Sequence, residues 1–352
     1  MTRFTAIQRL ILPLFIGLVL ILPAAGWEEK TFDGRGYVSV NSMKEFYRFK
    51  SLSRSGKQLV LDNGKPKWVT TAGKKVPGGR IEMRLRDGSH ECFMNDLKFV
   101  FSYPVRASGG KSWVSKIDLI KMVDPVLRPA DIRDGGKLRT VIIDPGHGGK
   151  DPGATNSLGT EARYNLKVAG ELKRYLESAG YTVIMTREDD RYLSLQQRVD
   201  FANRIKDNAI FVSIHHNSGN SRARGIETFT LSPVGVAHYG SGLKSSDFRK
   251  RAGNSHDSAN VALATAVHGR LLTTLRDPKS GKAYTLDRGI KRARFSVLSG
   301  VTHPAILVEC GFMTHPYEAR LIHREDYQRT LAKAIAVAIR TYHREVGRRA
   351  AK

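Results

Sequence analysis

The chain has 352 residues, enough for one large domain and one small one, and its 41% hydrophobic content argues against a disordered polymer. Its two cysteines show no spacing typical of a zinc finger or a metal cluster. Lys and Arg number 58 against 33 Asp and Glu, a net charge of +25. This excess favours an anionic partner, namely nucleic acid, a membrane surface or an acidic polymer, although a highly solvated basic surface would explain it too.

Residues 1–26 have the pattern of a secretory signal peptide. Arg3 and Arg9 precede an apolar run over residues 10–22, and small residues follow before Trp27. The run is shorter than the roughly 20 residues of a membrane-spanning helix, although an uncleaved anchor is an alternative. We therefore expect an exported protein of the periplasm or cell envelope, without a membrane span after signal removal. Export counts against a nucleic-acid partner and favours a cell-wall polymer.

Residues 27–121 predict a small α+β module. Short apolar or alternating segments indicate strands at residues 36–40, 58–61, 67–71, 80–85 and 97–101. Asp62-Asn63-Gly64 predicts a hairpin turn between residues 58–61 and 67–71. Residues 41–49 predict a helix with Ser42 as a possible N-cap. Residues 122–138 are rich in Pro, Gly and charged residues and are interpreted as a linker.

Residues 139–348 alternate between strands and helices. Strands are expected at residues 140–144, 181–186, 209–214, 225–231 and 305–309, and helices at residues 161–179, 195–205, 258–275 and 325–346. This alternation predicts an α/β domain with a mostly parallel central sheet and helices on both faces. Residues 232–257 are polar and rich in Gly and Ser, and they predict a loop insertion. Functional groups of such a domain gather at the carboxyl ends of the strands.

Four residues with catalytic chemistry occupy such places. His147 follows the first strand, Glu161 begins the next helix, and His215 and Glu309 end two further strands. Two imidazoles and one carboxylate are a common catalytic zinc set that leaves one position for water, and a second carboxylate can act as general base. Each residue taken alone has a structural interpretation, such as a helix-start Glu that favours the helix dipole. Their joint placement is therefore the stronger signal.

Several segments, in this order, resemble zinc-dependent N-acetylmuramoyl-L-alanine amidases of the cell-separation and sporulation type. The carrying motifs are Ile142-Ile143-Asp144-Pro145-Gly146-His147-Gly148-Gly149, Glu161 with Asn165-Leu166, Ser213-Ile214-His215, and Val308-Glu309-Cys310-Gly311-Phe312. The resemblance covers about residues 139–346. It implies one Zn²⁺ held by His147, Glu161 and His215, with Glu309 as the catalytic base. It also implies cleavage of peptidoglycan at the amide between N-acetylmuramic acid and L-alanine of the stem peptide.

One position departs from the family pattern, because His216 stands where a small residue is usual. Neighbouring strand residues point to opposite faces, so only one of the two histidines should face the metal, and we choose His215. His216 is left to contact substrate or to pack in the core. Further possible substrate or supporting residues are Asn217, Glu227, Arg288 and Lys291. Glu227 has the alternative of a surface carboxylate, and Arg288 and Lys291 are candidates for binding peptide carboxylates.

The surroundings of the site allow several hypotheses. In some relatives, a segment at the place of residues 232–257 blocks the site until an activator protein binds, and an autoinhibitory role is a hypothesis here. Residues 27–121 faintly resemble the small domain that precedes the catalytic part of copper amine oxidases, and either wall binding or a scaffold role is open. Cys92 and Cys310 fall in different predicted domains, which favours two buried thiols over a disulfide.

Three other functions compete with the amidase. A non-catalytic peptidoglycan-binding protein would be expected to lack one of the four residues. A zinc carboxypeptidase acting on wall peptides commonly has a closely spaced His-x-x-Glu pair, whereas His147 and Glu161 are fourteen residues apart. A nucleic-acid binder depends on charge alone and conflicts with export.

Overall fold

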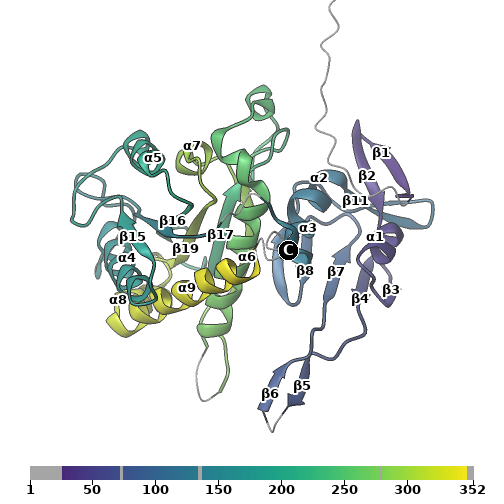
Figure 1. The fold of residues 1–352 in the computed structure, drawn as a ribbon, viewed down its shortest axis with the longest axis horizontal. Coiled ribbons are helices and arrows are strands. Elements are labelled where there is room, and N and C mark those ends of the chain that lie inside the picture. Colours follow the sequence, from purple (N-terminus) through teal and green to yellow (C-terminus); the bar gives the residue numbers. More distant parts are fainter. Residues whose placement is uncertain (1–25, 72–73, 134–136, 277–279, 347–352) are drawn as a thin grey trace, which may run out of the picture.

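The computed structural model describes residues 26–71, 74–133, 137–276 and 280–346. The predicted signal peptide thus lies outside the described residues, apart from Gly26. Figure 1 shows two lobes side by side, a larger one formed by the C-terminal part of the chain and a smaller one formed by the N-terminal part. No helix among the described residues combines the length and apolar character needed to cross a bilayer.

The larger lobe is built on a mixed sheet with the order β15-β12-β16-β19-β17-β18. Its strands are β12 (Thr140–Pro145), β15 (Thr182–Met185), β16 (Ala209–Asn217), β17 (Ile226–Leu231), β18 (Asp287–Ala293) and β19 (Ala305–Phe312). The first four in the sheet are parallel, whereas β17 is antiparallel to β19 and parallel to β18. The predicted α/β class with a mostly parallel sheet is confirmed. The reversal places the starts of β17 and β18 at the sheet edge where β12, β16 and β19 end.

Helices cover both faces of this sheet (Figure 1). One face carries α4 (Glu161–Glu177), α6 (Asp257–Thr274), α8 (Pro316–His323) and α9 (Glu325–Glu345), and the other carries α5 (Leu195–Arg204) and α7 (Ser296–Gly300). Alternation along each strand separates two buried clusters. In β16, Ile210, Val212 and Ile214 join the cluster under α4 and α9, whereas Phe211 joins the cluster under α5 and α7. Odd-numbered residues of β16 therefore face α5 and α7.

The N-terminal lobe extends the same sheet. Strand β9 (Leu97–Val100) pairs in parallel with β18 at Phe99 and Ile290, and the order continues β9-β8-β7-β4-β3. The other strands of this part are β3 (Ser51–Ser55), β4 (Gln58–Asp62), β7 (Glu82–Arg86) and β8 (Glu91–Met94). A second sheet contains β1 (Glu29–Phe32), β2 (Arg35–Ser39), β10 (Arg106–Ser108) and β11 (Lys111–Ser115). The module is therefore hydrogen-bonded directly to the larger lobe.

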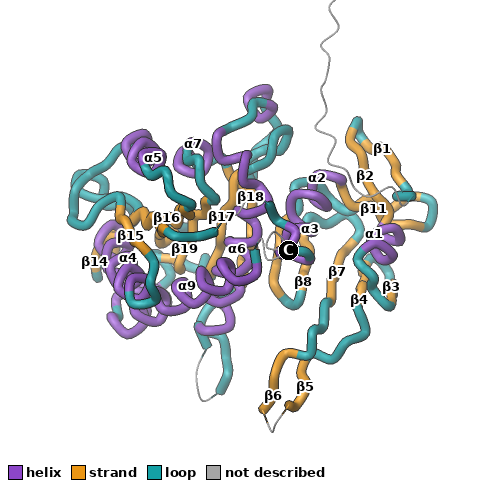
Figure 2. The backbone as a smooth tube through the Cα atoms, in the orientation of Figure 1, coloured by secondary structure: helices purple, strands orange, loops and turns teal. Residues whose placement is uncertain are grey.

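The predicted hairpin at Asp62-Asn63-Gly64 is wrong. Strand β4 pairs with β3 and β7, and β5 (Trp68–Thr71) pairs with β6 (Lys74–Pro77) in a separate ribbon that projects from the body (Figure 2). Asn63 continues the pairing toward β7, because its backbone N–H donates to the Ile81 carbonyl and its side-chain oxygen accepts from the Ile81 N–H. Asn63 is therefore bonded to the residue just before β7, and the chain does not turn back there to pair residues 58–61 with residues 67–71.

One further prediction for this region needs correction, and the structure adds detail to another. Helix α1 (Val40–Phe46) is capped by Ser39, whose hydroxyl accepts from the Ser42 N–H, so Ser42 is not the cap. Residues 122–138, interpreted as a linker, are partly helical. The lobes are joined by short helical turns: α2 (Lys116–Asp118), a π-helical turn (Leu119–Val123), α3 (Asp124–Leu127) and a 3₁₀ turn (Pro129–Asp131). Within them, Met122 and Val123 are fully buried. Apolar packing thus fixes the described part of this connection.

Candidate metal and catalytic site

Three charged or ionisable side chains form a row across neighbouring strands. Glu309 of β19 pairs with His215 of β16 on one side and with Glu227 of β17 on the other. Directly paired residues point to the same face of a sheet, and these three share the face covered by α5 and α7. The row lies in the carboxyl-terminal half of β19, which ends at Phe312. The reversed direction of β17 is what places Glu227, near its start, beside Glu309.

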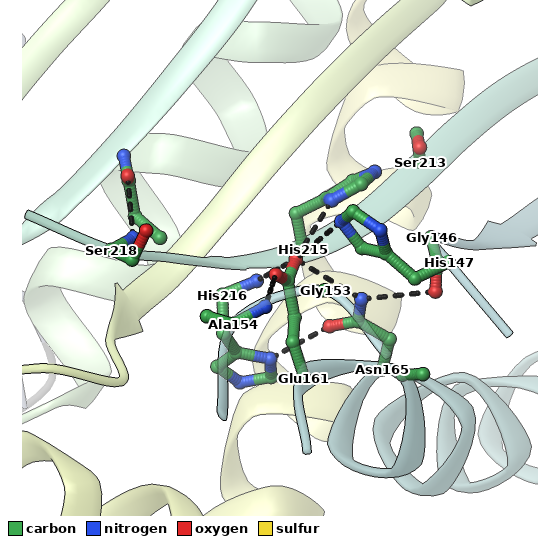
Figure 3. Close-up of polar contacts among 12 residues, drawn as sticks. Gly146, His147, Gly153, Ala154, Glu161, Asn165, Ser213, His215, His216 and Ser218 are labelled. Carbon is green, nitrogen blue, oxygen red and sulfur yellow. Dashed lines mark hydrogen bonds and ion pairs between the residues drawn. The ribbon is translucent and has the colours of Figure 1, made fainter. Parts of the chain in front are cut away.

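His147 and Glu161 complete a cluster at His215. The Nε2 atom of His147 lies 3.2 Å from Glu161 Oε1, and Nδ1 of His215 lies 2.9 Å from the same oxygen. One ligand atom from each residue lies within 4.8 Å of the others. Figure 3 shows both imidazole rings directed at the Glu161 carboxylate. Of the four residues predicted to act together, the structure therefore gathers three around one point and places Glu309 beside His215.

The loop that presents His147 is held by a buried polar network. Asp144 accepts hydrogen bonds from Thr186 and Ser213 and forms a buried ion pair of 2.7 Å with Arg198. Arg198 also donates to the carbonyl oxygen of His147 at 2.7 Å, which fixes the backbone of the histidine itself. That backbone has a φ of 60°, in the left-handed region rarely adopted by non-glycine residues. The network stabilises an unfavourable conformation that aims the imidazole at Glu161.

Glycine is required where the loop approaches the site. A Cβ atom at Gly146 would lie 2.1 Å from the His215 ring, and a Cβ at Gly153 would lie 2.6 Å from Glu161 Oε2. Neither position has room for a side chain. The glycines of this segment therefore allow close approach of backbone to the histidine and carboxylate groups.

The remaining polar atoms of His147 and Glu161 are oriented by neighbours. Nδ1 of His147 lies 2.8 Å from the Asp151 carboxylate, and the Ala154 N–H donates to Glu161 Oε2 at 2.9 Å. Asn165 donates to the Gly146 carbonyl oxygen. Such contacts are typical around metal-binding histidines and carboxylates. Sequence analysis missed Asp151, although its position four residues after His147 in a glycine-rich loop was a usable signal.

The surroundings shift the pKa values of the two glutamates, Glu161 and Glu309, in opposite directions. Burial opposes the ionisation of Glu161, but hydrogen bonds with His147 and His215 outweigh it and hold the pKa of Glu161 well below its ordinary value. Burial raises the pKa of Glu309 well above its ordinary value, and the charges of Glu161 and Glu227 add to this effect. The Glu309 Oε2 atom is buried and has no hydrogen-bond partner in the described part of the chain. Glu161 is thus a stable anion, whereas Glu309 is disposed to bind a proton.

His216 lies on the opposite face from His215. It is fully buried, its Nδ1 lies 2.8 Å from the Asn165 side-chain oxygen, and burial lowers its pKa to about 4. Its backbone N–H donates to Glu161 Oε1, as Figure 3 shows. Of the two alternatives for His216, the structure favours packing in the core, because its side chain is fully buried.

The four other candidate residues meet at one point. Asn217 donates to one oxygen of Glu227, and Arg288 and Lys291 form ion pairs with the other. Glu227 is 4% exposed, so the alternative of a surface carboxylate is wrong. Lys291 is also buried and its ammonium lies 4.5 Å from the centre of the Tyr239 ring, whereas the Arg288 side chain is about one-third exposed. Of the two cations expected to meet peptide carboxylates, only Arg288 is accessible.

The predicted insertion at residues 232–257 contains two 3₁₀ turns (Ser245–Phe248 and Ala252–His256). It is fastened mainly through Arg294, which donates to three of its carbonyl oxygens and forms an ion pair with Asp247. Tyr103 of the N-terminal lobe donates to the Gly235 carbonyl oxygen at 2.6 Å. These contacts attach the segment to the residue that follows β18 and to the N-terminal lobe. Cys92 and Cys310 are both buried and free.

Comparisons with known proteins agree with the motifs. The family model described as N-acetylmuramoyl-L-alanine amidase matches residues 141–341. The chain is 33% identical over 227 residues to N-acetylmuramoyl-L-alanine amidase AmiC of Neisseria meningitidis, covering 59% of this chain and 53% of that protein. It is 28% identical over 251 residues to N-acetylmuramoyl-L-alanine amidase AmiA of Escherichia coli, covering 67% of this chain and 86% of that protein. A crystal structure of N-acetylmuramoyl-L-alanine amidase from Clostridium difficile 630 shares 32% sequence identity at a TM-score of 0.47, covering 59% of this chain and 97% of that chain. The chain thus spans about half the length of the meningococcal relative.

Proposed function

This chain belongs to the N-acetylmuramoyl-L-alanine amidase family, and on that premise we propose that it hydrolyses the amide between N-acetylmuramic acid and L-alanine of the peptidoglycan stem peptide. The observation that carries the proposal is the convergence of His147, Glu161 and His215 within 4.8 Å, with Glu309 paired beside His215. A non-catalytic wall-binding protein would have no use for a Glu309 carboxylate whose Oε2 atom is buried without a hydrogen-bond partner among the described residues.

We propose that the metal is zinc. The donor set of two imidazole nitrogens and one carboxylate oxygen matches catalytic zinc sites, which leave a fourth position open. The contacts of Asp151 with His147 and of Ala154 with Glu161 supply the supporting shell that such ligands usually have. Bound zinc would polarise the scissile carbonyl and make a water molecule acidic.

The chain's own residues divide the remaining work. Glu309 accepts the proton of the attacking water and returns it to the amine of the departing L-alanine. Its raised pKa favours holding that proton until the amine leaves. Glu227 lies on the other side of Glu309 and forms ion pairs with Arg288 and Lys291. This arrangement keeps Glu309 basic without bringing a cation into direct contact with it.

The site of action follows from the substrate. We propose that the protein is exported through residues 1–26 and acts in the periplasm or cell envelope, where its large excess of Lys and Arg favours association with anionic wall polymers. The likeness of residues 27–121 to the small domain of copper amine oxidases stays a prediction. Control by an activator protein acting on residues 232–257 also stays a prediction, and its test is deletion of that segment, since unchanged activity would exclude autoinhibition.

The test is digestion of purified peptidoglycan with product identification by mass spectrometry. Release of intact stem peptides, abolished by a chelator and restored by zinc, would support the proposal. The Glu309→Gln variant should bind zinc and release stem peptides far more slowly than the wild type. Cleavage within the stem peptide would refute it in favour of a peptidase.

A further inference from the structure

Glu318 is a buried carboxylate close to the row formed by His215, Glu309 and Glu227. It lies in the first turn of α8, shortly after β19 ends, and it is 1% exposed. No ion pair within the described ranges involves Glu318, so no cation balances its burial. A carboxylate in such a place is stabilised by hydrogen bonds and by the positive end of the helix that carries it. Its hydrogen bonds are therefore the contacts that decide its role.

Three donors from three separate segments of the chain converge on the two oxygens of Glu318. The Gly225 N–H donates to both oxygens, at 3.0 and 3.1 Å. The Phe312 N–H donates to Oε2 at 2.9 Å, and the Thr285 hydroxyl donates to Oε1 at 3.0 Å. Each oxygen thus accepts two hydrogen bonds. This position requires a side chain that only accepts, and a carboxylate meets that requirement.

Each donor stands two or three residues along the chain from a charged or ionisable side chain of the site. The pairs, with the donor first, are Gly225 with Glu227, Phe312 with Glu309, and Thr285 with Arg288. Gly225 directly precedes β17, Phe312 is the last residue of β19, and Thr285 lies just before β18. These three strands are neighbours in the order β19-β17-β18. Glu318 therefore holds together the adjacent ends of three neighbouring strands.

The regular strand pairing is interrupted close to the same place. Strands β16 and β19 change register between His215 and Asn217, and β17 and β18 change register on either side of Glu227. Such irregularities bend a strand and redirect its side chains, and they are frequent next to active sites. Glu318 accepts the N–H groups of Gly225 and Phe312 beside these irregularities. Hydrogen bonds to α8 thus fix the strand ends where the ladder between the strands is irregular.

The packing at these strand ends leaves little room for adjustment. A Cβ atom at Gly225 would lie 2.7 Å from the Arg288 side chain, so the Gly225 backbone and Arg288 are in direct contact. The Arg288 guanidinium lies 4.7 Å from the centre of the Phe312 ring. Arg288 also forms an ion pair with Glu227, which is paired in the sheet with Glu309. A shift of any of the three strand ends would therefore be transmitted to the surroundings of Glu309.

We propose that Glu318 is a positioning residue of the amidase reaction, which binds three strand ends and thereby sets the placement of Glu309 and of the Glu227–Arg288 ion pair beside it. This inference rests on the proposed amidase function and assigns to α8 a part in it. The contacts of Glu318 are two backbone N–H groups and one hydroxyl, so it acts through Glu309 and not on the substrate. Glutamine keeps the size of the side chain but turns an NH₂ group toward these donors, so acceptors are lost.

The test compares Glu318→Gln with the wild type, both as zinc-loaded full chains acting on soluble peptidoglycan fragments. The kcat should fall roughly 100-fold, the scale of a reacting group misplaced by about 1 Å, whereas KM should change by less than about threefold. Rates are expressed per bound zinc, so that a loss of metal or of folded protein does not enter the comparison. An unchanged kcat in folded, zinc-loaded Glu318→Gln would overturn the proposal.

A second background separates positioning from general damage. The base is already absent in Glu309→Gln, so adding Glu318→Gln there should lower the residual rate by less than about threefold. A residue with a purely structural role would reduce the rate by the same factor in both backgrounds. Equal fold losses in the two backgrounds would therefore overturn the proposal.

Thr285→Val is a milder variant that removes one donor and keeps the Glu318 carboxylate. The two side chains have similar shapes, and the expected fall in kcat is roughly two- to tenfold, the scale of a single hydrogen bond. This fall should also disappear in the Glu309→Gln background. Where Glu318→Gln fails to fold, Thr285→Val decides alone, and an unchanged kcat then overturns the proposal.

Asp118→Asn is the matched control. Asp118 is also 1% exposed, and it accepts hydrogen bonds from the N–H groups of Ser102 and Tyr103 and from the Ser115 hydroxyl. It lies in α2, outside the larger lobe. The substitution should lower the urea concentration at the midpoint of unfolding and keep the wild-type kcat. A loss of kcat as large as in Glu318→Gln would overturn the proposal, because lost stability alone would then account for both.

The two proposals fail in distinguishable ways. Wild-type protein that does not cleave the fragments would refute the amidase function. Amide hydrogen exchange would then still test the holding of the strand ends, because it needs no cleavage. Peptides that contain Gly225 or Phe312 should exchange faster in Glu318→Gln than in the wild type, with exchange in β12 unchanged. Equal exchange in the two proteins would overturn the role of Glu318, whatever the activity of the wild type.

Discussion

Replacing Glu309 with glutamine should remove activity and stabilise the fold at the same time. The substitution keeps the shape of the side chain and removes its charge and basicity. Glu309 lies between His215 and Glu227 in the sheet, with Oε2 buried and without a partner in the described part of the chain. Its environment therefore opposes the ionised form that catalysis requires.

The expected loss of activity follows from the role of a general base. Positioned proton transfer contributes about 10²–10⁴-fold to a rate, equivalent to roughly 3–5 kcal/mol of barrier. The rate of stem-peptide release from peptidoglycan should fall by that factor in Glu309→Gln. Zinc content should stay equal to that of the wild type, since His147, Glu161 and His215 are unchanged.

The expected gain in stability depends on pH, and its sign follows from the direction of the pKa shift. Below pH 4.5, the ordinary pKa of a glutamate, Glu309 is protonated in both the folded and the unfolded chain and does not change the free energy of unfolding. As the pH rises above 4.5, the unfolded chain releases the proton freely, whereas the folded chain holds it. The free energy of unfolding of the wild type therefore falls with pH through this group. Glu309→Gln lacks this loss, so metal-free variant protein should be more stable at pH 7, by on the order of 1–3 kcal/mol.

Urea unfolding of the chelated proteins at pH 4 and pH 7 measures this difference. Glu188→Gln is the control, because that carboxylate is 60% exposed and should change neither activity nor stability appreciably. A stability difference that does not grow between the two pH values would refute the electrostatic reasoning. A rate reduced less than tenfold would refute the role of Glu309 as base.

Three further predictions concern the supports of the site. Asp151→Asn should weaken zinc binding about 10–100-fold, measured by competition with a chelator, because it weakens the contact that orients His147; unchanged affinity would contradict this. Arg198→Leu should lower the free energy of unfolding by roughly 3–5 kcal/mol, because it leaves Asp144 buried without its cation, and a change below about 1 kcal/mol in urea would contradict it. Asp287→Ala should accelerate amide hydrogen exchange in β9, where it accepts a backbone hydrogen bond, and leave exchange in β12 unchanged; equal effects on both strands would indicate general destabilisation.

The parts of the fold that sequence analysis predicted well are those determined by local pattern. Strands β12, β16 and β19 are continuous apolar runs, because helices bury them on both faces. Helix α4 buries Val168, Ala169, Leu172 and Leu176 at helical spacing and ends before Gly180, whose φ is +87°. Such signals lie within a single element. They carry no information about which strands are neighbours.

What the sequence could not show is therefore the order and direction of the strands, and the candidate site depends on both. Alternation alone separates His215 from His216, and the structure places them on opposite faces as that reasoning expected. Alternation cannot reveal that β17 is antiparallel to β19, a direction that places Glu227 beside Glu309. Nor can it reveal that Arg288 and Lys291 form ion pairs with Glu227. Nor does it reveal that β9 pairs with β18, since a single long-range pair leaves no local pattern. That one pairing makes the sheet of the N-terminal module continuous with the sheet of the larger lobe, and amide hydrogen exchange in β9 is where its consequence should be measured.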